Sequence, residues 1–398
     1  MPESLLSGVR VLDAATLAAA PLAATYLAEH GAEVIKVERP GSGDPIRDWG
    51  RRKDGTGLMW KSVGRNKKSV TLNLRTAEGQ DLLRQLAGQA DVLVVNTRPG
   101  TLRGWGLDYA TMHAAYPKLI MVHVTGFGLD GPDSDRPGFG TLGEAMSGFA
   151  HLTGEADSPP TLPSFMLADS VTSLTAAYAV MMALYHRDVH DAPGQLIDLN
   201  LIDPLSRMLE PSVLTYDQLG EVPRRCGNRW DVSAPRNTYL TKDRQWIAMS
   251  GSAPTVALRV YRAIGRPELA DDPEFSDPQR RLARSGEVDA MVAEWVSRHT
   301  RAEAMTVFRR EGVAAAPVYD APQLLEDPHL KARGIHVRVP DEDLGSMRVQ
   351  GPVPRFSATP GRVEHLGPAL GEHNKEIYGE LLGIPSDQLA ALADQGVI

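Results

Sequence analysis

The sequence predicts an α/β protein with a mostly parallel sheet that is covered by helices on both faces. Short apolar runs alternate with helix-like segments through the first half of the 398-residue chain. These runs are continuously apolar, as in strands whose two faces are both buried. A Pro/Arg/Gly/Asn-rich stretch at residues 219–236 then separates a second, smaller unit. A chain of this length normally forms two domains.

The elements of the first half follow from this alternation. The expected strands are apolar runs at residues 9–12, 33–37, 92–95, 119–124 and 195–199. The expected helices are at residues 22–30, 77–89 and 171–185. Residues 66–75 form a basic segment that becomes extended, and by themselves they predict a solvated edge. In such sheets ligands bind outside the carboxyl ends of the strands.

The domain organisation follows the same pattern. We expect a large domain at residues 1–219, completed by residues 333–398, then a linker at 220–236, a small domain at 237–320 and a return linker at 321–340. In the small domain, strands are expected at 245–249 and 314–318, and helices at 255–265, 288–299 and 301–311. Short helices at 375–382 and 386–393 close the chain.

The composition limits the partners and the compartment. The chain has 42 Lys and Arg against 50 Asp and Glu, a net charge of −8, whereas a general nucleic-acid binder carries a basic domain or patch. The single Cys226 excludes an internal disulfide and is typical of a reducing compartment. No signal peptide is visible, and the apolar run 174–184 is too short to span a bilayer. The sequence therefore predicts a cytoplasmic protein without nucleic-acid or membrane partners.

Arginines and glycines follow successive expected strands. Arg39 with Gly41 and Gly43 follows the second strand, and Arg98 follows the third, with Arg103 beyond it. Glycine lets backbone N–H groups approach a ligand, and arginine supplies charge-assisted hydrogen bonds. The repetition indicates a phosphate-bearing ligand, although loop arginines are often only solvated surface.

Several familiar motifs give weaker signals. Gly138–Gly143 matches the dinucleotide pattern G-x-G-x-x-G, but no strand precedes it and no acidic strand end follows at the right distance. His186 and His190 are four residues apart, yet a zinc site needs three or four ligands, so no metal is expected. The nucleophile elbow of serine hydrolases and the phosphate loop of NTPases are both missing.

Asp169 has two interpretations. It opens the apolar helix-like run at residues 171–185, where an Asp most often caps the helix by accepting a backbone N–H. A carboxylate in that place can instead attack a thioester and form a covalent acyl intermediate. The local sequence alone leaves both open.

Ordered blocks over essentially the whole chain are Leu6–Asp13, Leu27–Asp44, Asn66–Val70, Asn96–Gly100, Thr125–Gly128, Gly194–Gln195, Tyr239–Met249, Leu370–His373 and Gly396–Ile398. Together they resemble the class III CoA-transferases, the CaiB–BaiF family that includes formyl-CoA and carnitine CoA-transferases. The resemblance implies a Rossmann-like large domain, a smaller α/β domain and an interlocked homodimer. Its active site would lie between the large domain of one chain and the small domain of its partner.

The resemblance also implies the chemistry. CoA would move from an acyl-CoA thioester to a carboxylic acid through an aspartyl-acyl anhydride and an aspartyl-CoA thioester at Asp169. No metal and no permanently bound cofactor would be needed. Carried over by position, the expected CoA-binding residues are Leu17, Ala18, Arg39, Leu72, Asn73, Leu74, Arg75, Asn96, Thr97, Arg98, Arg103, Phe139 and Gly140, and the expected substrate lid is Ser250, Gly251 and Ser252.

Departures from the family pattern narrow the substrate. The run 18–20 is Ala-Ala-Ala where the formyl-CoA enzymes have Gln-Ala-Gly, and Arg103 lies one place from the usual basic position. A larger acid such as a dicarboxylate is therefore expected rather than formate or oxalate. An α-methylacyl-CoA racemase, or another isomerase of the family, is an alternative, but Phe139 and Gly140 stand where racemases have a His-Asp pair and neither can take a proton. A non-catalytic CoA-binding protein is the second alternative.

Overall fold

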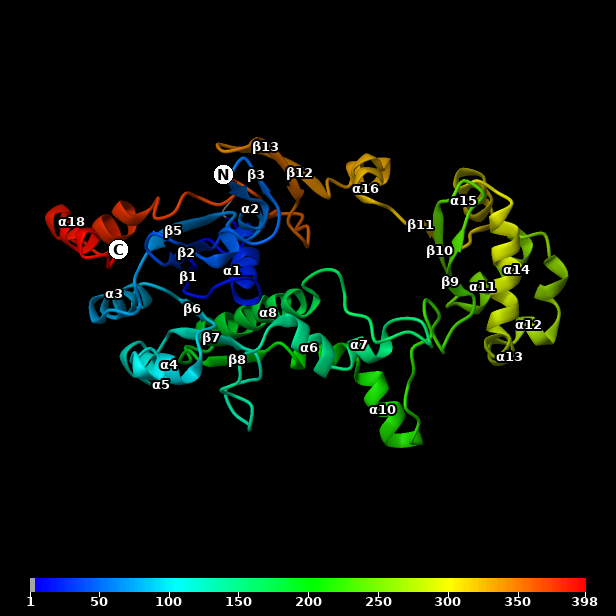
Figure 1. The fold of residues 1–398 in the computed structure, drawn as a ribbon, viewed down its shortest axis with the longest axis horizontal. Helices are drawn as coiled ribbons and strands as arrows, with labels where there is room; N and C mark the ends of the chain where they lie inside the picture. The colour runs from blue at the N-terminus through cyan, green and yellow to red at the C-terminus, as the bar shows by residue number, and fades with distance from the viewer. Residues whose placement is uncertain (1–3) are drawn as a thin grey trace. The chain divides into compact units, whose positions relative to one another are not determined.

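The computed structural model describes residues 4–398 and divides the chain into two compact units (Figure 1). The first unit consists of the chain up to Phe149, Leu162–Leu219 and Lys331–Ile398. The second unit consists of Ala150–Thr161 and Gly220–Leu330.

The first unit is built on a six-stranded sheet in which every neighbouring pair of strands is parallel. Its order is β5-β2-β1-β6-β7-β8, which is the third, second, first, fourth, fifth and sixth strand of the sheet in chain order. This is the order of the doubly wound dinucleotide-binding folds. The strands are β1 (Arg10–Asp13), β2 (Glu33–Glu38), β5 (Lys67–Thr71), β6 (Val92–Val95), β7 (Ile120–Thr125) and β8 (Leu196–Asn200). The expected α/β class is confirmed.

Neighbouring residues of each strand enter different cores. Val11, Val34 and Val92 pack with α1 (Ala19–Glu29) and α8 (Leu167–Val189), while Leu12, Ile35 and Leu93 pack with α3 (Ala77–Ala87) and the closing helices. This is the alternation that a sheet buried on both faces requires. The closing helices are η3 (Lys375–Leu381) and α18 (Ser386–Asp394). The shorter elements of this unit are η1 (Pro45–Arg47), β3 (Arg52–Lys53), β4 (Thr56–Gly57), α2 (Leu58–Val63), α4 (Pro99–Gly104), α5 (Tyr109–Ala115), α6 (Gly140–Met146), α9 (Asp203–Met208), α10 (Glu210–Leu219), β12 (His336–Asp341) and β13 (Gly345–Gln350).

The basic segment around β5 is not the solvated edge that its sequence predicts. Lys67, Ser69 and Val70 are fully buried, although β5 is the outermost strand. The C-terminal part of the chain covers it: the backbone N–H of His373 donates to the Ser69 carbonyl at 2.9 Å, and the Tyr378 hydroxyl donates to the Thr71 carbonyl at 2.8 Å. The local sequence pattern cannot predict a contact between residues that are some 300 positions apart.

A buried ionic network joins Asp13 at the end of β1, Lys36 in β2, Lys67 at the start of β5 and Asp44 after β2. The Lys67 ammonium lies 2.9 Å from Asp13, and the Lys36 ammonium lies 2.9 Å from Asp44 and 3.7 Å from Asp13, with all four side chains fully or almost fully buried. The pKa of Lys36 is raised by these carboxylates against the opposing effect of burial. Buried charges persist when each has a partner, and here the partners come from three strands and the loop that follows β2.

Helix α8 begins earlier than expected, and this changes the place of Asp169. The helix starts at Leu167 with Met166 before it, and no side chain caps it. Asp169 is therefore the third helical residue, so its interpretation as the capping residue is wrong. By length and composition α8 alone among residues 4–398 could cross a membrane, but Ala176 and Val180 are buried against the sheet and α1. A core helix has the same properties.

The second unit holds a three-stranded antiparallel sheet of order β11-β10-β9 packed on helices. The strand β9 (Arg236–Leu240) was not expected from the sequence, while β10 (Trp246–Ser250) and β11 (Ala315–Pro317) lie near their expected places. The helices are η2 (Pro267–Ala270), α11 (Pro254–Ala263), α12 (Pro273–Ser276), α13 (Pro278–Ala283), α14 (Ser285–Ser297) and α15 (Arg301–Glu311), and α7 (Phe149–Leu152) enters the unit from the first. The segment expected as a return linker contains α16 (Ala321–Glu326), α17 (Pro328–Ala332) and β12.

Candidate active site

The loop between β1 and α1 is held by three side chains: Asn96 directly after β6, Lys36 within β2, and Asp44 in the loop that follows β2. The Asn96 side chain forms two hydrogen bonds with the Thr16 backbone, at 3.0 and 2.8 Å. The Asp44 carboxylate accepts the Leu17 N–H at 3.0 Å, and the buried Lys36 ammonium donates to the Ala15 carbonyl. Leu17 has a φ of 66°, a conformation that costs energy for any residue with a Cβ and so needs support from its surroundings. The network therefore fixes the entry to α1.

Asp169 lies beside this loop, in a cavity of about 460 Å³ that the first unit forms by itself. Leu17, Ala18, Phe139 and Gly140 all line this cavity. Burial raises the pKa of the Asp169 carboxyl, while the backbone N–H of Ala19 at the start of α1 favours its charged form. The sequence predicted these four neighbours, and the fold brings them together with Asp169.

Two glycine contacts create the space for the carboxylate. A Cβ atom on Gly140 would lie 2.1 Å from Oδ2 of Asp169. A Cβ atom on Gly126, after β7, would lie 2.6 Å from the Cα of Gly138, so the chain entering α6 runs directly against the end of that strand. Close approach of this kind admits only glycine. The glycines of this segment thus serve packing and not a dinucleotide.

Sequence reasoning missed several residues of this cavity. Glu144, one turn along α6, is 4% exposed, and its Oε1 accepts the Ala168 N–H at 3.3 Å. Trp49 and Phe165 are large apolar side chains that line the cavity and remain exposed to solvent. Phe165 could have been found from the sequence, because it lies four residues before Asp169. Trp49 and Glu144 are distant from Asp169 in sequence, so no local pattern indicates them. The remaining lining residues are Thr141, Leu162, Pro163 and Met166.

Four of the predicted phosphate contacts are exposed arginines at the same edge of the sheet. Arg39 follows β2, Arg75 follows β5, and Arg98 and Arg103 lie just before and in α4. Across residues 4–398, none of these four contacts a carboxylate, although most other arginines of the first unit do. The fold therefore leaves positive charge available where a phosphate would be bound.

The other predicted contacts are partly committed to the protein itself. Leu72 is buried in the core, and Asn73 bonds through its backbone N–H to the Val397 carbonyl at 2.7 Å, while Leu74 packs at the border of the same core. The carbonyl of Thr97 accepts a hydrogen bond from Nε2 of the buried His123 at 2.7 Å. These residues shape the strand ends, and a ligand would meet them mainly through their backbone.

The expected lid belongs to the second unit. Ser250 ends β10, its hydroxyl lies 2.8 Å from that of Ser252, and a Cβ on Gly251 would meet Pro235 at 2.7 Å. These three residues form a tight turn, and their role as a substrate lid remains a prediction.

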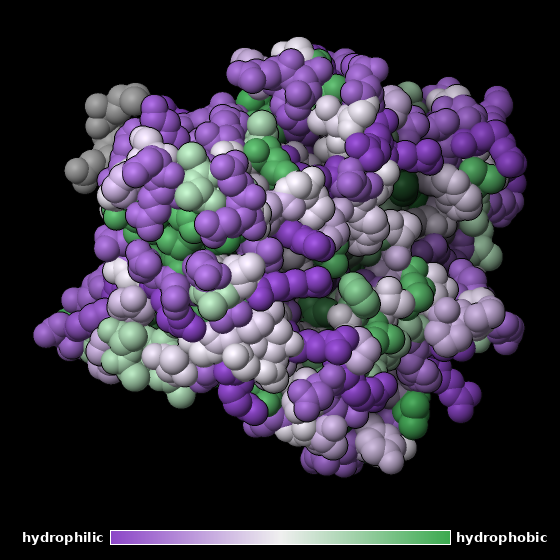
Figure 2. Space-filling model, turned by 60° about the vertical axis from the view of Figure 1, so that its left-hand side comes forward, coloured by the Kyte–Doolittle hydropathy of each residue, from purple (hydrophilic) through white to green (hydrophobic). Residues whose placement is uncertain are grey.

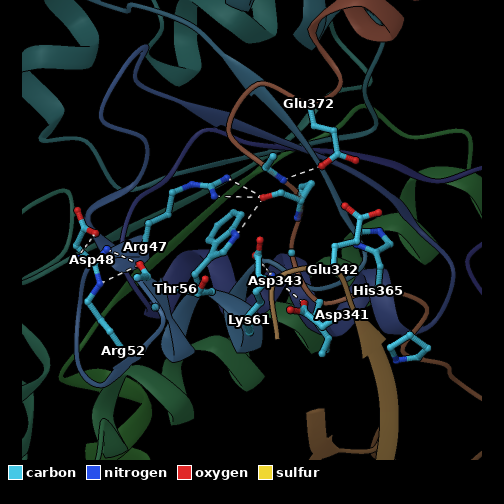
Figure 3. A pocket seen from close by; sticks show the side chains of 18 of the residues that line it. Arg47, Asp48, Arg52, Thr56, Lys61, Asp341, Glu342, Asp343, His365 and Glu372 are labelled. Atoms are coloured by element: carbon cyan, nitrogen blue, oxygen red, sulfur yellow. Dashed lines mark hydrogen bonds and ion pairs between the residues drawn. The ribbon is translucent and has the colours of Figure 1, made fainter. Parts of the chain in front are cut away.

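A different cavity of about 550 Å³ lies in the first unit between the segment around α2, the end of β12 with the turn after it, and residues 365–373 (Figure 3). Its cations are already paired: Arg47 with Glu38, Arg52 with Asp48, and Lys61 with Asp341 and Asp343. The Arg47 guanidinium also stacks on Trp60 at 3.8 Å. Paired cations leave little to bind a phosphate, so this cavity does not compete with the Asp169 site. Within residues 4–398, no three His, Cys, Asp or Glu side chains are grouped to hold a metal ion.

Comparisons with known proteins show the family of the chain. The profile of CoA-transferase family III matches residues 6–374. The chain is 42% identical over 398 residues to a succinyl-CoA–D-citramalate CoA-transferase of Chloroflexus aurantiacus, covering all of this chain and 99% of that protein. It is 40% identical to the beta subunit of a succinyl-CoA–L-malate CoA-transferase of the same organism, covering 99% of this chain and 98% of that one. Its structure matches a CaiB/BaiF family protein of Brucella suis with a TM-score of 0.83 and 31% identity, over 95% of this chain and 100% of the other.

Proposed function

The chain belongs to CoA-transferase family III, and from this premise we propose that Asp169 is the nucleophile that carries the acyl group and then CoA. The resemblance found in the sequence is confirmed, and the protein is an enzyme that transfers CoA between an acyl-CoA thioester and a carboxylic acid. The observation that carries the proposal is the Asp169 carboxylate in its cavity between two helix starts, with Gly140 leaving room for it.

The proposed reaction has four steps that balance without a metal or a redox partner. An Asp169 oxygen attacks the thioester carbon, the C–S bond breaks, and CoA thiolate leaves an aspartyl-acyl anhydride. The thiolate then attacks Cγ of Asp169, which releases the donor acid as its carboxylate and forms the aspartyl-CoA thioester. The acceptor carboxylate attacks this thioester, giving a second anhydride and thiolate. Attack of the thiolate on the acceptor acyl carbon completes the exchange and frees Asp169.

The surroundings of Asp169 support each requirement of this scheme. The backbone N–H of Ala19 holds a negatively charged oxygen. The loop that Asp44 fixes at Leu17 can present the Ala18 N–H to the oxyanion that forms during attack. The unpaired Arg39, Arg75 and Arg98 supply positive charge for the phosphates of CoA at the same edge. Binding of the remote nucleotide part can thereby position the thioester.

We propose succinyl-CoA as the donor and a dicarboxylate or hydroxy-dicarboxylate as the acceptor. The support is the specificity of similar proteins, which are named as CoA-transferases of succinyl-CoA with D-citramalate, L-malate or glutarate. Ala18 adds an apolar side chain to the cavity lining where a polar group would serve a smaller acid.

We further propose a cytoplasmic homodimer whose chains interlock. Apolar side chains reach the surface in several patches on the face drawn in Figure 2. Large exposed apolar side chains are frequent on α8 and α10, among them Tyr178, Met182, Tyr185, Tyr216 and Leu219. Apolar area of this kind is typical of a surface that a partner covers. Light scattering after size-exclusion chromatography should give twice the 43.1 kDa chain mass, and a monomer at micromolar concentration would contradict this assembly.

One experiment tests the nucleophile directly. The enzyme is incubated with succinyl-CoA and treated with hydroxylamine, and peptide mass spectrometry should find the hydroxamate on Asp169. Asp169→Ala should lose both the label and the exchange of CoA between succinyl-CoA and malate. Full exchange by this variant would refute the assignment. Solvent deuterium entering the α-carbon of a 2-methylacyl-CoA without an acceptor acid would instead support the racemase alternative.

A further inference from the structure

A second carboxylate shares the cavity with Asp169. Glu144 reaches it from α6, is 4% exposed, and forms no ion pair with any residue in the range 4–398. Its Oε1 accepts the backbone N–H of Ala168, the residue directly before Asp169, at 3.3 Å. Glu144 therefore ties α6 to the first turn of α8 and brings a negative charge to the nucleophile.

Among residues 4–398, no Lys, Arg or His side chain lines the cavity to neutralise this charge. The other lining residues are apolar apart from Thr141 and Asp169 itself. From α1 the group that faces Asp169 is the Ala19 N–H, and from α6 it is the Glu144 carboxylate. Burial is the largest cause of the raised pKa of Asp169, and the charge of Glu144 acts in the same direction. Two carboxylates in a poorly solvated cavity repel each other more strongly than in water.

We propose that Glu144 is a positioning residue that also activates Asp169 by repelling its free carboxylate. When Asp169 attacks a thioester, its negative charge passes to the departing CoA thiolate, and the side chain becomes a neutral anhydride or thioester. The repulsion from Glu144 is then relieved. Glu144 thus favours the acylated forms of Asp169 over the free carboxylate, while its bond to Ala168 holds the side chain in place. This inference rests on the proposed nucleophile.

The test separates the charge of Glu144 from its hydrogen bond. Glu144→Gln keeps an oxygen acceptor for the Ala168 N–H and removes the charge. We expect kcat/KM with succinyl-CoA to fall by about tenfold, the effect of one charge at a partly buried site. The acid limb of the pH profile should move to lower pH, and less of Asp169 should be found as the aspartyl-CoA thioester at steady state.

Two variants serve as comparisons. Asp108→Asn is the matched control, because Asp108 also accepts a helix N–H at 3.3 Å, that of Thr111, but lies outside the cavity; its rate and pH profile should equal those of the wild type. Glu144→Asp keeps the charge and should keep the acid limb near its wild-type position even if the rate falls. It also provides a reading if Glu144→Gln does not fold.

The outcomes distinguish this inference from the proposed function. If the wild-type enzyme forms no adduct on Asp169, the nucleophile assignment fails first. If the adduct forms and Glu144→Gln has the wild-type acid limb and the wild-type fraction of modified Asp169, Glu144 is only structural and the inference is overturned. If only Glu144→Asp folds, this variant supplies the test because it keeps the charge. An acid limb at clearly lower pH than that of the wild type would then overturn the inference.

Discussion

A Cβ atom on residue 140 would lie 2.1 Å from Oδ2 of Asp169, so the carboxylate occupies the place of a side chain that Gly140 lacks. Asp169 of α8, the proposed nucleophile, and Gly140, the first residue of α6, are thus fitted to each other across some thirty residues of sequence. The contact involves the end of one side chain and the backbone of the other residue. It therefore affects the reaction more than the fold.

Gly140→Ala should lower kcat for CoA exchange by roughly a hundredfold, since displacement of a catalytic group by about 1 Å has that order of effect. The melting temperature should change little, because the Asp169 side chain can turn away. Gly286→Ala is the matched control: Gly286 also lies in the first turn of a helix, α14, and a Cβ there meets nothing within 4 Å. Equal activity of Gly140→Ala and wild type would contradict the placement of Asp169.

Asp169→Asn should stabilise the protein at neutral pH, raising its melting temperature by roughly 1–3 °C. Burial raises the pKa of this carboxyl above its ordinary 3.8, so the charged form is less favourable in the folded chain than in the unfolded one. That penalty is present above the folded pKa and disappears as the pH falls below 3.8. The gain should therefore shrink towards zero on acidification. Differential scanning calorimetry at several pH values measures the gain in melting temperature, with Asp157→Asn at an exposed position as the control. A gain that grew on acidification would contradict a raised pKa of Asp169.

Lys67→Met should destabilise the protein by about 3–5 kcal/mol, because it leaves Asp13 with one buried partner fewer. Lys68→Met, in the same strand, removes a half-exposed ammonium that pairs with Glu33 and Glu376 and should cost no more than about 1 kcal/mol. Urea unfolding followed by circular dichroism compares the two. Equal losses would show that the buried ionic network does not stabilise the fold.

Arg75→Ala and Arg39→Ala should each raise KM for succinyl-CoA by roughly tenfold and leave kcat nearly unchanged, because they remove binding that substrate and transition state share. The effect should weaken as salt is added. Arg298→Ala is the control, since Arg298 is an exposed arginine of the second unit paired with Glu294. Steady-state kinetics at two salt concentrations provide the measurement, and an unchanged KM in both site variants would remove these residues from the CoA site.

The sequence predicted the elements whose signals are local. The strand at 92–95 and the helix at 301–311 have the expected bounds, because a continuous apolar run and a capping box at Thr300 and Glu303 mark them within a few residues. It missed β9, whose sequence Arg-Asn-Thr-Tyr-Leu is mostly polar and becomes a strand only through its pairing with β10.

The order of short motifs in the sequence by itself determined the family and the fold class. It also led to the proposal that Asp169 is the reacting carboxylate. Only the tertiary structure decided the surroundings of Asp169. It moved this residue from the helix cap to the third helical position, buried Lys67 under a segment three hundred residues away, and placed Glu144 in the same cavity. These facts depend on which side chains are brought together by folding. Burial and electrostatic interactions depend on distance in space, and residues that are close in space can be far apart in sequence.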